Sequence, residues 1–450
     1  MATTSASASL LSNARQETQD VALIDARERT LALIEGVEER DLSSVIDPLL
    51  SPLLWDLGHI ANFEQRWLVG NNDAELDHIY NPFEQPRSDR GELSLLTAEQ
   101  CFRYMEEVRD VVLARFHSLD PFLLELVIQH EQQHNETMLQ LLCQLDGYRP
   151  SESLVSAYSP PPEGPQHIRL RETAARAFRP AATAALSDWV AFPAGSYVVG
   201  NSPESEGEFV YDNERERHTI AVDSFEIATR PVTNADFQEW IELGGYKKPH
   251  WWSADGLAWL DETRVTMPLG WEREGDEYFT YEFGQRRAIE PDAPVCHISW
   301  FEADAYARAH AARLPSEFEW EIAASYDPRH AFEAPRRRYA WGDDPWTPGA
   351  SNLDQLAFGT VAAGAADHGF GLIDMLGQVW EWTSSTFSAY PGFAPFCYRE
   401  YSEPFFDSGY RVLRGGSWAT RARSVDNRFR NWDHPQRRQI FSGMRLARNS

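Results

Sequence analysis

The sequence predicts a multidomain α+β protein, with a four-helix bundle at the N-terminus and a loop-rich α+β domain with little regular structure at the C-terminus. Its 450 residues are enough for two or three domains that each bury a core. Up to about residue 148, apolar residues recur at steps of three and four, as in amphipathic helices. After residue 186, short apolar runs alternate with turn signals, and fourteen of the sixteen tryptophans fall there. We therefore expect a disordered N-terminus (1–15), the bundle (16–148), a connector (149–186) and the C-terminal domain (187–450).

Four segments have the pattern of bundle helices. Two lie around residues 18–36 and 97–118, and a third is SPLLWDLGHIANFEQRWLVG, with Pro52 suited to its first turn and Gly70 to its end. The fourth carries a stripe at steps of three and four that includes two histidines: Leu123, Val127, His130, His134, Met138, Leu141 and Leu145. The two histidines are therefore expected to face the core of the bundle.

The rest of the chain is interpreted from turn residues and short apolar runs. Residues 149–186 are rich in Pro, Ala and Arg, as in a connector between domains. WVAFPAGSYVVG and HTIAVDSFEIA predict strands, and SWFEADAYARAHAARL predicts one good helix among them. A domain of this kind carries its chemistry on loops.

The helix with the two histidines contains HEQQH, which matches the H-E-x-x-H signature of zinc proteases. His130 and His134, four residues apart, share one helix face and form a plausible metal pair. A protease also needs a third ligand, and Thr137 and Gln140 occupy the positions of the Gly and His in one large protease class. Glu152, the nearest candidate for another class, lies at the edge of a stretch that contains SPPPEGP, where prolines disfavour a helix. The pattern predicts a metal pair and argues against a protease.

The third metal ligand is expected from a facing helix of the same bundle. His59, in WDLGHIANFE, is the strongest candidate, although a lone histidine in apolar surroundings is more often a buried core residue. His78 and His117 are weaker alternatives in more polar sequence. Three neutral imidazoles suit Zn, Fe, Ni or Cu, so the ligand type alone does not choose the metal.

The composition limits the kinds of partner. A formal net charge of −28 argues against nucleic acid or an anionic membrane and favours a small-molecule substrate. The four cysteines lie without CxxC spacing, which favours a reducing compartment. The first residues lack the pattern of a signal peptide, and no run approaches the ~18 apolar residues of a membrane span. These features predict a cytoplasmic enzyme.

The chain also resembles a known family. LLWDLGHIANFEQRWL and HEQQHNETM are similar to DinB-like bundles. FPAGSYVVGN, RPVTNADFQEWI, YAWGDD, VWEWTSS and RVLRGGSW are similar to the formylglycine-generating-enzyme fold, which is C-type-lectin-like. Fused in this order, they resemble the ergothioneine-pathway sulfoxide synthases over nearly the whole chain. Those nonheme iron enzymes use O2 to join a cysteine-derived thiol to hercynine (Nα-trimethylhistidine).

The resemblance implies a role for each matching residue in the N-terminal half. His59, His130 and His134 would bind Fe(II), with O2 as co-substrate. Arg87 and Arg90, in FEQPRSDRGEL, would bind the glutamyl carboxylate of γ-glutamylcysteine, in keeping with the bidentate pairing of guanidinium and carboxylate. Taken alone, such an arginine pair in a polar loop is usually solvated surface.

The resemblance assigns further roles to C-terminal residues and to one residue of HEQQH. Asp433 would take the ammonium group of the thiol substrate, Tyr398 would donate a proton during oxygen activation, and Tyr401 would line the pocket. Gln133 would reach hercynine through water, and Asn431 and Trp432 would border its carboxylate; Trp432 could instead face the trimethylammonium group. Aromatic residues in proline-rich loops otherwise serve mostly in packing. A structural Ca2+ in the C-terminal domain is a further expectation, and the role of Glu131 stays open.

Other functions fit the sequence less well. Formylglycine generation needs a reactive cysteine pair, whereas Cys397 stands alone in that region. A zinc-dependent thiol S-transferase would use the same helices with a different metal, and a binding module would not need inward-facing histidines. Closer alternatives use cysteine, make 5-histidylcysteine sulfoxide, or use a selenosugar. The arginine pair and Asp433 favour γ-glutamylcysteine, with hercynine as second substrate, in a monomer or small homo-oligomer.

Overall fold

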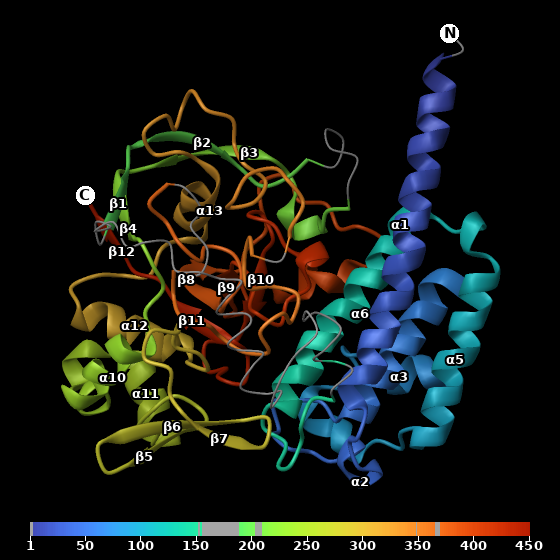
Figure 1. Cartoon of the computed structure of the whole chain (residues 1–450), viewed down its shortest axis with the longest axis horizontal. Coiled ribbons are helices and arrows are strands. Elements are labelled where there is room, and N and C mark those ends of the chain that lie inside the picture. Colours follow the sequence, from blue (N-terminus) through green and yellow to red (C-terminus); the bar gives the residue numbers. More distant parts are fainter. Residues whose placement is uncertain (1–2, 152–153, 155–188, 203–208, 348, 365–369) are drawn as a thin grey trace, which may run out of the picture. The chain divides into compact units, whose positions relative to one another are not determined.

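The computed structural model describes residues 3–151, 154, 189–202, 209–347, 349–364 and 370–450, with side chains from residue 19 onward. The chain divides into two compact units, Met1–Ala157 and Tyr158–Ser450. Most of the expected connector lies outside the described residues. The first unit is helical and the second mixes strands and helices (Figure 1). The predicted α+β fold class is thereby confirmed.

The N-terminal unit is built from four long helices, α1, α3, α5 and α6, which run alongside one another in Figure 1. Its helices and helical turns are α1 (Thr3–Ile34), α2 (Glu39–Leu42), α3 (Leu53–Glu64), the π-turn η1 (Gln65–Val69), α4 (Ala74–Ile79), η2 (Arg87–Glu92), α5 (Ala98–Ala114), η3 (Phe116–Ser118) and α6 (Pro121–Leu142). Helix α1 packs against α6, and α3 packs against both α5 and α6. Helix α1 begins at Thr3, within the segment expected to be disordered. The disorder of residues 1–15 stays a prediction.

The ends of these helices follow from local sequence. Asp120 accepts hydrogen bonds from the Phe122 and Leu123 backbone N–H groups, and Pro121 occupies the first turn of α6. Thr97 and Gln100 form a reciprocal capping box at the start of α5. After η1, Gly70 adopts φ 76°, the left-handed conformation that ends a helix at low cost.

The described residues of the C-terminal unit form four small sheets. Their strands are β1 (Trp189–Phe192), β2 (Gly195–Val199), β3 (His218–Val222), β4 (Phe225–Ala228), β5 (Trp271–Glu274), β6 (Glu277–Glu282), β7 (Gln285–Ala288), β8 (Trp380–Thr386), β9 (Arg411–Arg414), β10 (Asn431–Asp433), β11 (Ser442–Met444) and β12 (Ala447–Asn449). The strand orders are β1-β4-β12, β10-β9-β8-β11, β2-β3 and β5-β6-β7. All neighbours are antiparallel except β11 and β8, which are parallel.

Helices and short 3-10 turns connect these strands. They are η4 (Asp212–Glu214), α10 (Asn234–Glu242), η5 (Gly245–Lys247), η6 (Pro249–Trp251), α11 (Ala254–Thr263), α12 (Trp300–Ala309), α13 (Glu317–Ser325), η7 (Arg399–Tyr401), η8 (Glu403–Phe405) and η9 (Ala422–Ser424). The predicted helix corresponds to α12, but α10, α11 and α13 show that one helix was too few. All three have an N-cap side chain that accepts from the helix backbone.

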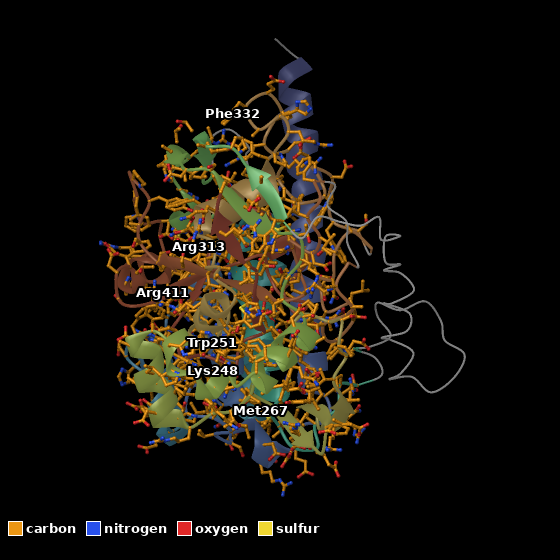
Figure 2. All side chains as sticks on the ribbon, turned by 90° about the vertical axis from the view of Figure 1, so that its left-hand side faces the viewer. Lys248, Trp251, Met267, Arg313, Phe332 and Arg411 are labelled. Carbon is orange, nitrogen blue, oxygen red and sulfur yellow. The ribbon has the colours of Figure 1, made fainter. Side chains whose placement is uncertain are left out.

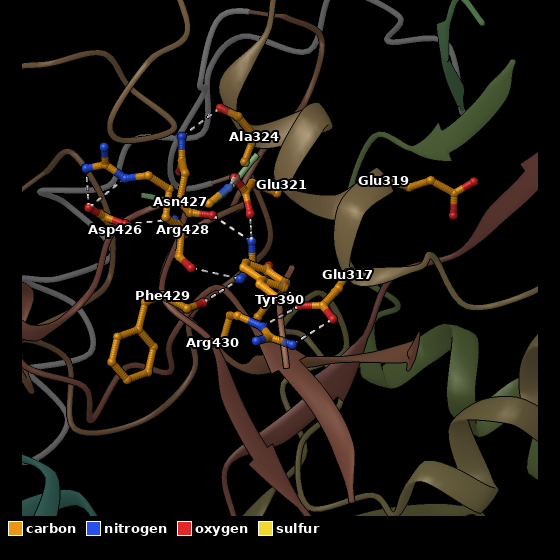
Figure 3. Close-up of polar contacts among 12 residues, drawn as sticks. Glu317, Glu319, Glu321, Ala324, Tyr390, Asp426, Asn427, Arg428, Phe429 and Arg430 are labelled. Carbon is orange, nitrogen blue, oxygen red and sulfur yellow. Dashed lines mark hydrogen bonds and ion pairs between the residues drawn. The ribbon is translucent and has the colours of Figure 1, made fainter. Parts of the chain in front are cut away.

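Buried ion pairs fix the segment that leads into β10 (Figure 3). The Arg430 guanidinium donates to both Glu317 carboxylate oxygens, at 2.7 and 3.0 Å, and to the Asn213 carbonyl at 2.7 Å. Arg414 donates to Glu321 at 2.5 Å and to the carbonyls of residues 427–429. These guanidinium groups therefore tie the backbone before β10 to helix α13.

Basic side chains cover aromatic rings on one side of the C-terminal unit. Lys248 Nζ lies 4.4 Å from the ring centroid of Trp251, and both side chains are labelled in Figure 2. On the same side the Arg411 guanidinium lies 4.2 Å from the ring of Trp300. These cation–π contacts let half-exposed aromatic residues lie beside charged groups at the surface. Within the described part of the chain, no helix combines the length and apolar character needed to cross a membrane.

Candidate functional site

Three histidines from two helices meet inside the N-terminal unit. His59 comes from α3, and His130 and His134 come from successive turns of α6. The Nε2 atoms of His59 and His130 are 3.1 Å apart, and the nearest potential ligand atoms of the three rings all lie within 4.8 Å of one another. Among the described residues, no other set of three or more His, Cys, Asp or Glu side chains is grouped closely enough to hold one ion. The weaker candidates lie elsewhere, His78 beside Glu84 and His117 exposed.

Hydrogen bonds fix the protonation of two rings. His59 Nδ1 lies 2.7 Å from the Tyr80 carbonyl oxygen, which can only accept, so Nδ1 carries the proton and Nε2 keeps its lone pair. His134 Nδ1 lies 3.2 Å from Oδ1 of the buried Asp56, and an ionised carboxylate likewise only accepts. Both imidazoles thereby have a partner of the kind that orients metal-binding histidines.

Aromatic stacking fixes the planes of the rings. Trp55 stacks on His59 with centroids 4.8 Å apart, and Phe63 stacks on His130 at 3.6 Å. Burial lowers the pKa of His59 and of His130 well below the ordinary value, and the neighbouring histidines lower it further. Both imidazoles are therefore neutral near pH 7, as metal binding requires.

Two further positions fix the loop that supports His59. Trp55 Nε1 donates to the Ile79 carbonyl at 3.1 Å, next to the Tyr80 carbonyl that His59 uses. A Cβ on Gly58 would lie 2.2 Å from Cζ of Tyr80, so only glycine lets this ring pack against α3. The sequence WDLGH thus combines a stacking residue, a space for Tyr80 and a ligand.

The residues present fit a transition-metal ion. Two imidazole nitrogens that each lie about 2.1 Å from one ion are about 3 Å apart when they meet at a right angle, and the Nε2 atoms of His59 and His130 are 3.1 Å apart. His59 and His130 are buried and neutral, His134 is partly buried, and all three rings lie beside one another or beside aromatic rings. The donor set suits Zn, Cu, Fe or Ni and does not favour Ca or Mg.

Glu131 of HEQQH belongs to a buried network of two arginines and two glutamates, one from each long helix. Arg27 donates to Glu64 at 2.7 Å and to Glu131 at 2.8 Å, and Arg109 donates to the same two carboxylates at 2.6 and 2.8 Å. Thr30 Oγ1 also donates to Glu131. Burial alone would raise the pKa of Glu131, but the Arg27 and Arg109 guanidinium groups outweigh burial and hold it below the ordinary value. The carboxylate neither faces solvent nor is free to act as a hydrolytic base.

The two arginines of FEQPRSDRGEL lie in different environments. Arg87 is exposed on η2. Arg90 is buried; its guanidinium donates to the Ser51 hydroxyl at 2.6 Å and the Gln85 carbonyl at 2.9 Å, and lies 3.5 Å from the Trp55 ring centroid. The Trp55 ring therefore packs against both Arg90 and His59. Gln133, also expected to bind substrate, is half-buried on α6.

The predicted residues of the C-terminal unit gather around β10 and η7. Tyr401 meets Trp432 edge to face, with centroids 5.4 Å apart, and the ring of Tyr398 lies 6.2 Å from that of Tyr401. Asn431 Oδ1 accepts from the Trp432 backbone N–H at 2.8 Å. Asp433 accepts from the His434 N–H at 2.7 Å, and Arg437 lies 3.7 Å from its other oxygen. The five residues thus share one region, in which Arg437 would compete with any other cation for the Asp433 carboxylate.

Two residues of this region were missed in the sequence. Tyr211 stacks on Tyr401 with centroids 4.1 Å apart. Asp212 is fully buried and accepts from the Ser402 hydroxyl at 2.5 Å and from the Phe396 N–H at 3.4 Å, so it holds both ends of the segment that carries Tyr398. Tyr211 and Asp212 lie about 190 residues before this segment, so no local sequence pattern predicts the contact. The aromatic-acidic pair Tyr211–Asp212, at the start of a 3-10 turn, was the one visible cue.

Comparisons with known proteins agree with both units. The DinB superfamily model matches residues 22–138, and the model of the sulfatase-modifying factor enzyme 1-like domain matches residues 174–450. The chain is 40% identical to the hercynine oxygenase of Mycolicibacterium thermoresistibile, covering 94% of this chain and 93% of that protein. It is 41% identical to the hercynine oxygenase of Mycolicibacterium smegmatis, covering 94% and 96%. The formylglycine-generating enzyme of Streptomyces coelicolor is 33% identical but covers only 54% of this chain.

Fold and site define a DinB-type helical domain with a three-histidine centre, joined in one chain to a domain of the sulfatase-modifying-factor type. The identity of 40% and 41% to two hercynine oxygenases, over 94% of this chain, shows the family. The chain belongs to the hercynine oxygenase family and is an enzyme of the oxygenase class.

Proposed function

We propose that this enzyme is a nonheme iron(II)- and O2-dependent sulfoxide synthase of ergothioneine biosynthesis. It joins the thiol sulfur of γ-glutamylcysteine to imidazole C2 of hercynine and gives γ-glutamyl-hercynylcysteine sulfoxide. The observation that carries the proposal is the cluster of three histidines, two of them buried, in a chain 40% identical, over 94% of its length, to a hercynine oxygenase. The predicted residues around β10 add support.

The reaction balances with one molecule of each substrate. The S–H and C2–H bonds break, a carbon–sulfur bond forms, the sulfur gains one oxygen atom, and the second oxygen leaves as water with the two hydrogens. Iron, when bound by His59, His130 and His134, supplies the electron-transfer chemistry that lets O2 react with paired-electron substrates. The protein contributes binding, orientation and protons.

The charged groups of the thiol substrate account for three residues. Arg87 and Arg90 would bind the glutamyl carboxylate, and the exposure of Arg87 suits a residue that meets an incoming substrate. Arg90 already contacts Ser51 and Gln85, which fix its guanidinium in place before any substrate arrives. Asp433 would take the ammonium group. Free cysteine has no glutamyl carboxylate, so the arginines favour γ-glutamylcysteine.

The remaining residues serve hercynine and proton transfer. Gln133 would reach hercynine through water, while Asn431 and Trp432 would border its carboxylate or trimethylammonium group. Tyr398 would donate the proton that directs the reaction to the sulfoxide, and Tyr401, stacked on Tyr211, would line the pocket. In the absence of that proton, oxidation of the thiol to a sulfinic acid is the expected diversion.

Metal-dependent turnover tests the proposal directly. The full chain, loaded anaerobically with Fe(II) or Zn(II), is mixed with hercynine, O2 and one donor: γ-glutamylcysteine, cysteine or a selenosugar. We expect O2 uptake and sulfoxide product, identified by mass spectrometry, only with iron, and the highest kcat/KM with γ-glutamylcysteine. His130→Ala should lose the metal and the activity. Thiol transfer supported by zinc would replace the proposal with an S-transferase, and faster turnover of cysteine or the selenosugar would replace the donor.

A further inference from the structure

Asp56 is a buried carboxylate that contacts His134, a candidate metal ligand. It lies on α3 three residues before His59, with only 1% of its surface exposed. Oδ1 lies 3.2 Å from His134 Nδ1, and Oδ2 has no hydrogen-bond partner among the described residues. A buried carboxylate without compensation is costly. The imidazole N–H of His134 is therefore the group that compensates Asp56.

The three histidines are consequently not equivalent. His59 donates from Nδ1 to a neutral backbone carbonyl of Tyr80, whereas His134 faces a formal negative charge. A carboxylate behind an imidazole fixes the Nδ1–H tautomer, aims Nε2 and makes Nε2 a stronger donor. The ligands contribute no charge, so a carboxylate in contact with one of them supplies negative charge that three imidazoles lack.

We propose that Asp56 is a positioning residue that orients His134 and strengthens its bond to the metal. The inference deepens the proposed function and rests on it for the identity of the ligands. Because α3 carries both Asp56 and His59, one helix would position a ligand from each of the two facing helices. The sequence WDLGH would then hold a whole half of the site: the residue behind His134, the glycine that admits Tyr80, and a ligand.

Binding of Co(II) to the full chain, followed by its visible absorption, tests the proposal without any turnover. We expect Asp56→Asn to weaken Co(II) binding by about 10- to 100-fold and to change the absorption bands, and Asp56→Glu to recover part of the affinity. Asn62→Ala is the matched control, because Asn62 is buried on the same helix and donates a hydrogen bond to Asp77 instead. The Co(II) affinity of Asn62→Ala should stay within about threefold of the unaltered chain, below the smallest effect expected when a metal-binding histidine loses its hydrogen-bond partner.

Wild-type affinity in Asp56→Asn would overturn the inference. The proposed ligand set fails separately, if His134→Ala keeps full Co(II) affinity. Should the Asp56 variants not fold, the unaltered metal-free chain still gives an answer through the 15N shifts of its histidine rings. His134 is expected as the Nδ1–H tautomer, and an Nε2–H tautomer would contradict the role given to Asp56.

Discussion

Glu131 accepts a hydrogen bond from Arg27 Nε at 2.8 Å, which joins the acid of HEQQH to a helix about a hundred residues away. With Glu64 and Arg109 the pair forms a charge-balanced set that spans α1, α3, α5 and α6. The two candidate metal ligands of α6, His130 and His134, flank this residue. The network therefore fixes the helix on which they lie.

Glu131→Gln should destabilise the N-terminal unit by about 3–5 kcal/mol, because it leaves two buried guanidinium groups with one carboxylate fewer. Urea unfolding followed by far-UV circular dichroism measures this change. Glu99→Gln, which breaks an exposed pair with Arg103 on α5, should cost less than about 1 kcal/mol. The pKa of Glu131 is lowered, so its contribution is present above the ordinary value of 4.5 and lost as pH falls through the folded-state value. Equal losses in both variants would contradict the network's role.

Gly58→Ala should destabilise the protein and weaken metal binding, because the new Cβ would lie 2.2 Å from the Tyr80 ring. In a Tyr80→Ala background the ring is absent, and the same change should stabilise α3 by about 1 kcal/mol through its higher helix propensity. Thermal unfolding of the four proteins in this cycle measures the change of sign. If Gly58→Ala changed the stability in the same direction in both backgrounds, the Tyr80 ring would not be the reason for a glycine at position 58.

Arg87→Met should raise KM for γ-glutamylcysteine by about 10- to 100-fold, the effect of one charge-assisted hydrogen bond, with little change in KM for cysteine. The two thiols differ by the glutamyl group, so cysteine is an internal control. Arg90→Met should also lower the melting temperature, because Arg90 contacts Ser51, Gln85 and Trp55 in the folded protein. Parallel increases in KM for both thiols would remove the carboxylate role of Arg87.

Tyr398→Phe should keep Co(II) and substrate binding and shift the product from sulfoxide toward sulfinate by about tenfold or more, as expected for loss of a general acid. The product ratio is measured by mass spectrometry of complete reactions. Tyr339→Phe removes a hydroxyl from a tyrosine stacked on Trp341 in the same unit and should leave the ratio unchanged. An unchanged sulfoxide yield in Tyr398→Phe would remove its assignment as proton donor.

Asp212→Asn should change how stability depends on pH. Burial raises the pKa of Asp212 from 3.8 to about 6, only partly offset by its hydrogen bonds from Ser402 and Phe396. The folded form thus holds the proton more tightly, so this contribution is full below 3.8 and is lost as pH rises through about 6, a change of about 3 kcal/mol. Urea unfolding at several pH values, followed by tryptophan fluorescence, should show this loss in the unaltered chain but not in Asp212→Asn. Asp407→Asn, an exposed acid that accepts from Ser388, is the control; a loss that persists in Asp212→Asn would assign it to another group.

Periodicity predicted the parts of the site that lie on regular helices. His130 and His134 follow from the apolar stripe of α6, and His59 follows from the need for a facing ligand. Asp56 and Glu131 could not be found in this way, because a charged residue in a helix normally indicates a solvent face. Helix α6 is instead buried on nearly all sides, polar residues included. Its charges are compensated by residues of other helices, which no local pattern reveals.

The C-terminal unit was harder to predict because its order comes from contacts between distant segments. Tyr211 and Asp212 support Tyr401 and Ser402, nearly 200 residues later in the chain. Helices α10 and α13 are only nine residues long each, too short for a clear stripe. Resemblance, and not periodicity, placed Tyr398, Asn431 and Asp433 among the candidates, and their roles stay predictions.

The ion pairs of Glu131 with Arg27 and Arg109 also limit which reactions this helical bundle can be engineered to catalyse. A designer who wished to turn the three-histidine centre into a hydrolase would start from a motif that already contains the required acid. That acid cannot be released by changing its neighbours on α6, since the groups that hold it lie on α1 and α5. Both guanidinium groups would have to be replaced and the bundle stabilised again. The packing of the four helices therefore prevents Glu131 from acting as a hydrolytic base, whichever metal is bound.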